Sequence, residues 1–188
     1  MQTTSEKSWI RELVEFIILI VVIVIPFRIF VAEPYIVSGI SMSETYESGH
    51  YLIINKFWHK LSDIERGDVL VFKSPNDDKK FYIKRAIALP GETIKITNSI
   101  VSVTPVGSDT PKILDEPYIK NATFAELEIT LTEEQYFMMG DNRANSYDSR
   151  AWGPLDKSAI RGEPILRLFP FNQISLSPGR YTDYSINE

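Results

Sequence analysis

The 188-residue sequence predicts a mainly β protein in which one N-terminal transmembrane helix precedes an antiparallel β domain that carries a small β insertion. Two observations predict this fold class. Every residue from 16 to 27 is apolar, and after Pro34 short runs of β-branched and aromatic residues alternate with turn-forming residues, without a long amphipathic helical pattern. We therefore expect an N-terminal segment with the anchor over 1–32, a β-rich domain over 33–188, and an inserted subdomain over 93–133.

The anchor is predicted from an apolar window, 13–32, in which only Glu15 and Arg28 are charged. At a rise of about 1.5 Å per residue, a helix over this window spans the roughly 30 Å hydrocarbon core of a bilayer. A buried helix of a soluble protein would show a polar face, which this run lacks. A cleaved signal peptide would need small residues before its cleavage point, where the bulky Phe30 stands. We therefore expect the segment to be retained as an anchor.

The strands of the β domain are predicted from short runs bounded by turn-forming residues. The polar stretch 105–126 is expected to form an exposed loop or a small satellite hairpin, and the tail 179–188 is expected to fray. The predicted strands are Tyr51–Asn55, Val69–Lys73, Phe81–Leu89, Thr93–Thr97, Ile100–Thr104, Leu127–Leu131, Tyr136–Met139 and Ile165–Phe169.

Composition excludes several classes of function. The net charge of −5, without a clustered basic stripe, argues against a nucleic-acid partner. The chain has no cysteine, which excludes disulfides, thiolate catalysis and cysteine-based zinc sites. Its two histidines, His50 and His59, have no acidic ligand motif around them, so we expect no metal site.

A hydrolase without cysteine or metal needs a hydroxyl nucleophile and a base. Ser41 lies nine residues beyond Ala32, so an extended chain keeps it within about 30 Å of the end of the anchor. The stretch 39–43 lacks the final glycine of a Gly-x-Ser-x-Gly nucleophile elbow. A triad that recruits a histidine is not excluded by the spacing, although no feature of the sequence supports it.

A candidate base lies in the strand-like run 81–87, where Lys84 stands among apolar residues. Partial desolvation would lower the pKa of its amine and allow it to act as a general base. The pattern alone favours a simpler interpretation, a surface lysine whose stem lies along the sheet. The polar stretch 140–153 likewise fits either an ordinary hydrogen-bonded loop or a segment that orients catalytic groups.

Taken together, these segments resemble the ordered motifs of the bacterial type I signal peptidases. The resemblance covers most of the chain and is weakest in 93–133 and after Phe171. A single hydrophobic span and a Glu33-Pro34 junction precede the motifs, as in that family. The motifs are Ser38–Thr45, Arg66–Phe72, Tyr82–Ala86 followed by Leu89–Glu92, and Gly140–Gly153.

The resemblance implies a membrane-bound serine endopeptidase that removes signal peptides from exported preproteins after small-x-small sites, without a cofactor. Ser41 would be the nucleophile, and Lys84, neutral in an apolar surround, the general base. The Ser41 N–H would stabilise the oxyanion with Ser38 as a further donor, and Ser146 would orient the lysine. The catalytic domain would lie on the extracytoplasmic side of the cell membrane, in contact with the lipid bilayer.

The resemblance also assigns supporting residues. Two ion pairs, Asp141 with Arg85 and Asp148 with Arg150, would hold the site together. An extended substrate would add as a strand beside residues 82–84. Its small side chains would enter shallow pockets lined by Tyr35, Val37, Met42, Tyr82 and Ile83.

Glu44 stands where this family usually has proline. A carboxylate that pointed inward would favour the charged form of Lys84 and oppose catalysis. This keeps open an alternative, a catalytically impaired, membrane-tethered peptide-binding homologue. We expect Glu44 to face solvent and therefore favour the active peptidase. A soluble-type Ser-Lys protease that cleaves repressors is disfavoured by the anchor and by the lack of a DNA-binding half.

Overall fold

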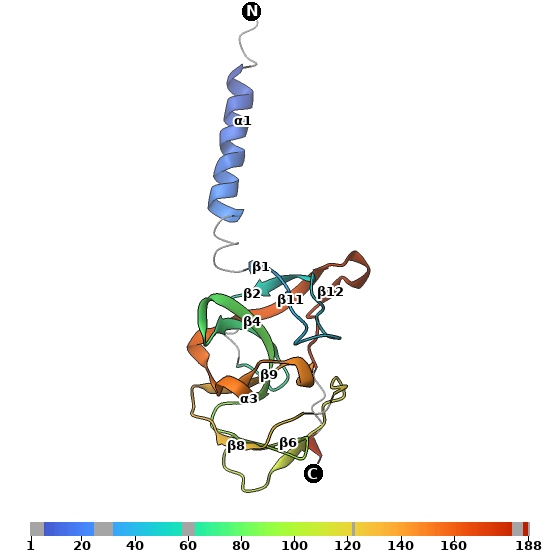
Figure 1. Ribbon diagram of the computed structural model, residues 1–188. Helices are drawn as coiled ribbons and strands as arrows, with labels where there is room; N and C mark the ends of the chain where they lie inside the picture. The colour runs from blue at the N-terminus through green and yellow to red at the C-terminus, as the bar shows by residue number, and fades with distance from the viewer. Residues whose placement is uncertain (1–5, 25–31, 58–62, 122, 182–185, 188) are drawn as a thin grey trace, which may run out of the picture.

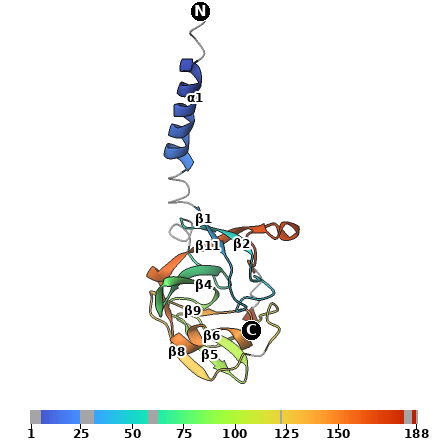
Figure 2. The same ribbon diagram turned by 45° about the horizontal axis from the view of Figure 1, so that its top comes forward.

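The structure, a computed structural model, describes residues 6–24, 32–57, 63–121, 123–181 and 186–187. It consists of an N-terminal helix that stands apart from a β domain, as both orientations in Figures 1 and 2 show. Helix α1, Glu6–Leu19, continues into one π-helical turn, Ile20–Val24. Within the described ranges, no helix combines the length and the apolar character that a membrane crossing requires. The predicted anchor falls partly outside these ranges, because residues 25–31 are not described.

The larger sheet is antiparallel and contains the strands of both halves of the chain. Its order is β1-β2-β11-β3-β4-β9-β10, and β12 pairs with β11 beyond this path. The strands are β1 Ala32–Ile36, β2 Tyr51–Asn55, β3 Val69–Ser74, β4 Asp77–Ala88, β9 Gln135–Met139, β10 Leu155–Asp156, β11 Ile160–Phe169 and β12 Ser175–Leu176. The antiparallel β fold predicted from the sequence is confirmed.

The smaller sheet has the order β13-β7-β6-β5-β8. Its strands are β5 Thr93–Thr97, β6 Ile100–Thr104, β7 Lys112–Leu114, β8 Leu127–Thr130 and β13 Ile186–Asn187. Strands β5 to β8 come from the predicted insertion, but β13 comes from the C-terminal tail. The expectation that this tail frays is wrong for Ile186 and Asn187, which pair with Leu114 and Ile113.

The two sheets share one hydrophobic core. Ile94 and Val103 of the smaller sheet pack in the same fully buried cluster as Ile87, Phe137 and Met139 of the larger sheet. The insertion therefore buries its apolar face against the rest of the domain rather than in a core of its own. The predicted domain boundaries stay a prediction.

A separate buried cluster supports the end of the larger sheet where β1 and β2 meet β3 and β4. Alternate residues of β2, Leu52 and Ile54, point into this cluster, as expected for a strand with one buried face. Met42 and Tyr46, from the turns after β1, complete it from the other side. The chain between β1 and β2 is thereby fixed over the surface of β3 and β4.

Candidate active site

Ser41 and Lys84 meet at this end of the larger sheet. Lys84 lies on β4, where it pairs with Leu70 of β3, and Ser41 lies in the turns that follow β1. The Lys84 Nζ donates to the Ser41 Oγ at 2.5 Å. Hydrogen bonds from Ser43 N to Ile40 O and from Tyr46 N to Met42 O close the turns around the serine. A hydroxyl and an amine from distant segments are thus held in contact.

The Lys84 amine is buried, and only 4% of the residue is exposed. The pKa of this amine is lowered from 10.5 to about 8: burial is the largest cause, Asp148 and Asp141 partly oppose it, and the nearby charge of Arg150 adds to the lowering. Within the described part of the chain, no carboxylate lies at ion-pair distance from this amine. About one tenth of Lys84 is therefore uncharged at pH 7, and this neutral fraction is the form that can act as a general base.

An open groove of about 110 Å³ runs beside the two residues. Four of the five predicted pocket residues line it, namely Tyr35, Val37, Tyr82 and Ile83, together with Ser38, Ser41 and Lys84. Four further apolar residues, which were not predicted from the sequence, also line the groove: Ile36, Leu52, Val71 and Phe81. Ile36 lies between the predicted lining residues Tyr35 and Val37, and Phe81 directly precedes Tyr82. Their place in these extended segments is the sequence feature that could have predicted them.

Met42 does not line the groove, contrary to the prediction. Its side chain is buried in the core beneath the site, and its Sδ accepts a hydrogen bond from the Asp141 N–H at 3.4 Å. The physical reason is the turn after Ser41, which directs the next side chain inward to join the cluster under β2. Met42 therefore supports the serine from below.

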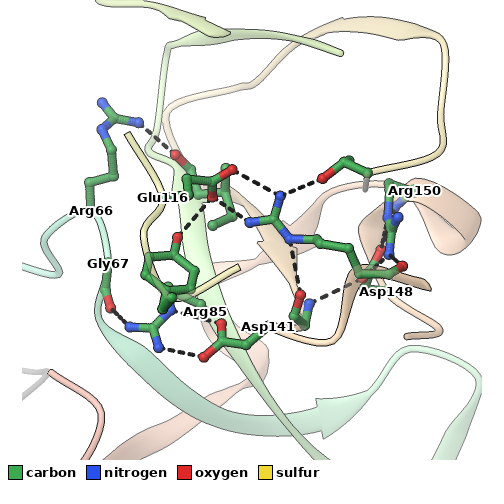
Figure 3. Close-up of polar contacts among 12 residues, drawn as sticks. Arg66, Gly67, Arg85, Glu116, Asp141, Asp148 and Arg150 are labelled. Atoms are coloured by element: carbon green, nitrogen blue, oxygen red, sulfur yellow. Dashed lines mark hydrogen bonds and ion pairs between the residues drawn. The ribbon is translucent and has the colours of Figure 1, made fainter. Parts of the chain in front are cut away.

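The two predicted ion pairs, Arg85 with Asp141 and Arg150 with Asp148, are present (Figure 3). The Arg85 guanidinium binds the Asp141 carboxylate through two hydrogen bonds, from Nε to Oδ1 at 2.9 Å and from Nη2 to Oδ2 at 2.6 Å. Arg150 grips Asp148 in the same way, with both distances 2.8 Å. Burial alone would raise the pKa of Asp148, but the hydrogen bonds and the charge of Arg150 outweigh burial and hold that pKa below its usual range.

A third buried ion pair was missed. Arg143, in the short 3-10 turn Arg143–Asn145, binds the Glu116 carboxylate with both Nη atoms, Nη1 to Oε2 at 2.9 Å. Glu116 lies in the polar stretch that we expected to be exposed, 27 residues away in the chain. Their spacing in the sequence could not predict this pair, because a polar segment has the same composition whether it is exposed to solvent or packs against a buried guanidinium.

We call these three pairs the charged wall, defined as Arg85, Asp141, Arg143, Glu116, Asp148 and Arg150. Its three guanidiniums and three carboxylates balance, so it adds little net charge behind Lys84. The largest influence on the lysine is therefore its own burial.

The two remaining predicted residues are placed as follows. Ser38 is exposed and lines the groove next to Ser41. The Ser146 Oγ is buried and has no hydrogen-bond partner among the residues that the structure describes, so the predicted bond to Lys84 is not formed in this structure. It packs against Gly140, where a Cβ would collide with both Ser146 and the Ser41 carbonyl. The Asp148 carboxylate lies near enough for this hydroxyl to contribute to its lowered pKa.

Glu44 faces away from the lysine. Its side chain is exposed and forms an ion pair with Lys120 at the rim of the site. The expectation that it faces solvent is met. Among the described residues, no group of three His, Asp or Glu side chains is arranged to hold a metal ion, and His59 lies outside those residues.

Comparisons with known proteins identify the family of the chain. The family model described as "Signal peptidase, peptidase S26" matches residues 10–169. Signal peptidase I of Bacillus licheniformis is 33% identical, over 92% of this chain and 96% of its own length. Probable signal peptidase I-2 of a Synechocystis strain is 34% identical, over 93% of this chain and 80% of its own.

A solved signal peptidase I from Enterococcus faecalis V583 is 26% identical, with a TM-score of 0.46, and covers 54% of this chain and 97% of its own. The family assignment rests on the family model and on the relatives that match along nearly the whole chain. The chain therefore belongs to the signal peptidase family, peptidase S26, and is a serine peptidase of the signal peptidase I type.

Proposed function

We propose that this peptidase removes signal peptides from exported proteins, cutting after small-x-small sites, with Ser41 as nucleophile and Lys84 as general base. The signal peptidase I relatives support the reaction class. The observation that carries the residue assignment is the 2.5 Å contact between the Lys84 amine and the Ser41 hydroxyl in a buried, apolar surround.

In the first half of the reaction, the neutral Lys84 amine takes the proton of Ser41 as its Oγ attacks the scissile carbonyl. The oxyanion that forms is stabilised by the Ser41 N–H and the Ser38 hydroxyl. Lys84, now an ammonium, gives its proton to the leaving amine, the peptide bond breaks, and an ester to Ser41 remains. In the second half, Lys84 takes a proton from water, the hydroxide attacks the ester, and the proton returns to Ser41.

The groove supports an extended substrate with small side chains. Two continuous segments, 35–38 and 81–84, supply most of its lining residues. A substrate strand placed between them would gain backbone hydrogen bonds, while the limited depth of the groove favours residues such as alanine near the cut. Ser146 is assigned the role of orienting Lys84 once the substrate is bound.

Tethering to the cell membrane, with the β domain on the extracytoplasmic side, is part of the proposal. The support is the apolar window 13–32 and the exposed apolar side chains of α1 and the following turn, among them Phe16 and Val22. A signal peptide also lies in the bilayer, so a tether raises the local concentration of the cleavage point near Ser41.

The test is cleavage of a peptide with alanine at the first and third positions before the cut, by purified full-length protein in detergent. Ser41→Ala and Lys84→Met are each expected to abolish turnover, while the exposed Lys95→Met retains it. Turnover that persists in Ser41→Ala would refute the assignment. A parent protein that binds this peptide without cutting it, with binding retained in Ser41→Ala, would instead indicate the catalytically impaired homologue.

A further inference from the structure

The segment between β7 and β8 contacts the catalytic elements in several places. We call residues 115–121 the insert loop. The Arg85 Cζ lies over the Tyr118 ring, 4.2 Å from the ring centroid. Lys120 forms an ion pair with Glu44. The Asn121 Nδ2 donates to the Asn142 Oδ1 at 3.3 Å. The predicted insertion therefore forms part of the support of the site.

Glu116 makes the most buried of these contacts. Its carboxylate binds both arms of Arg143, a residue that is 1% exposed, and also accepts the Tyr118 hydroxyl at 2.8 Å. Arg143 further donates to the Thr123 Oγ1 at 2.9 Å. Because a buried guanidinium without a carboxylate is costly, Glu116 holds Arg143 in one position.

Arg143 in turn holds the main chain that contacts Ser41. Its Nε donates to the Gly140 carbonyl at 3.0 Å. Gly140 packs directly against the Ser41 carbonyl, which accepts the Asn142 N–H at 3.0 Å. A shift of residues 140–142 would therefore move the serine relative to Lys84.

We propose that Glu116 is a positioning residue for the peptidase reaction: through Arg143 it fixes residues 140–142 and thereby holds Ser41 against Lys84. This inference rests on the proposed roles of Ser41 and Lys84. Glu116 is not among the residues that line the groove, so it acts on the reacting groups and not on substrate binding.

The experiment compares Glu116→Gln with Glu128→Gln in the full-length protein. Glu128 lies on β8, the strand that follows the insert loop, but its ion pair with Lys95 is exposed. Glu116→Gln keeps the shape of the side chain and removes its charge. We expect kcat to fall about 10- to 100-fold, because small misplacements of reacting groups have effects of this size, and KM to stay within about twofold. The control should match the parent.

Two further readouts separate positioning from a general loss of structure. The kcat is expressed per folded molecule, with the folded fraction taken from near-UV circular dichroism. The pH dependence of kcat/KM should keep its acid limb near the parent value, because Glu116 does not contribute to the shift of Lys84. A kcat within twofold of the parent, a change confined to KM, or a displaced acid limb would each overturn the proposal.

If Glu116→Gln does not fold, Thr123→Val carries the same test. It removes one acceptor of Arg143 in a side chain of similar size, and we expect kcat per folded molecule to fall about threefold. An unchanged kcat would overturn the proposal. Ser41→Ala keeps the two hypotheses apart: turnover that does not need Ser41 refutes the proposed function, whereas an active, Ser41-dependent enzyme that is indifferent to Glu116 refutes only this inference.

Discussion

Lys84 and Arg143 are both cationic side chains that the fold buries, yet their surroundings differ. Lys84 lies at the groove beside a hydroxyl, with its pKa lowered to about 8. Arg143 lies in the charged wall with a carboxylate across both arms of its guanidinium. Burial without a paired carboxylate disfavours the charged form of Lys84 and lowers its pKa. Burial with a paired carboxylate keeps Arg143 charged and fixes its position.

The two regions depend on each other. Asp148 and Asp141 favour the charged form of Lys84, but each is paired with an arginine and burial outweighs their effect. Because the positive and negative charges of the charged wall balance, desolvation has the largest influence on the protonation of the Lys84 amine. Hydrogen bonds from the arginines of the wall to main-chain carbonyls hold residues 140–150 behind the site. The predictions below break one region at a time.

The largest effect is expected from breaking the wall. Asp141→Asn removes the carboxylate that binds two nitrogens of the buried Arg85 guanidinium, which costs about 3–5 kcal/mol of unfolding free energy. Urea denaturation followed by circular dichroism measures it. Asp78→Asn, which removes an exposed partner of Lys73, is the control and should change stability little. Equal effects of the two substitutions would contradict the distinction.

Removal of the buried amine is expected to stabilise the protein. The pKa of Lys84 is lower in the folded state, so the unfolded chain binds more protons between about pH 8 and 10.5, and stability rises with pH across that window. Below pH 8 the cost of burying this amine is fully present. Lys84→Met should therefore raise the unfolding free energy at pH 7 by up to about 3 kcal/mol.

The gain from Lys84→Met should shrink as the pH approaches 10.5, because the folded parent then carries a neutral lysine and the unfolded chain is losing the same proton. Denaturation curves at pH 7 and pH 10 measure the difference. The exposed Lys95→Met should show no such pH dependence. A gain that does not vary with pH would mean that ionisation of Lys84 is not its source.

The smallest effect is expected at the exposed rim. Glu44 has a backbone φ of +83°, a conformation that favours glycine, and its pair with Lys120 is solvent-exposed. Glu44→Gly should raise stability by about 0.5 kcal/mol, since relief of strain exceeds the loss of a surface pair. Glu44→Pro should destabilise, because proline cannot adopt this φ and removes the N–H that donates to Glu47. Thermal melts of the two variants measure both changes, and a more stable proline variant would show that the backbone differs here.

Local patterns predicted much of this molecule. The runs 51–55, 93–97 and 100–104 form strands with those bounds, because alternation within a strand is visible in the sequence. The motif resemblance supplied Ser41, Lys84 and two ion pairs. Met42 and Glu116 were misplaced for a shared reason: their positions depend on turns and on partners far away in the chain, which local pattern does not encode.

The central claim is that the fold lowers the pKa of the Lys84 amine beside the Ser41 hydroxyl, so that the neutral base is available near neutral pH. Its most direct test is NMR of ¹³Cε-labelled lysine across pH 6 to 11, with the Lys84 signal assigned from its loss in Lys84→Met. We expect a titration midpoint near pH 8. A midpoint near 10.5, the ordinary value for lysine, would contradict the account.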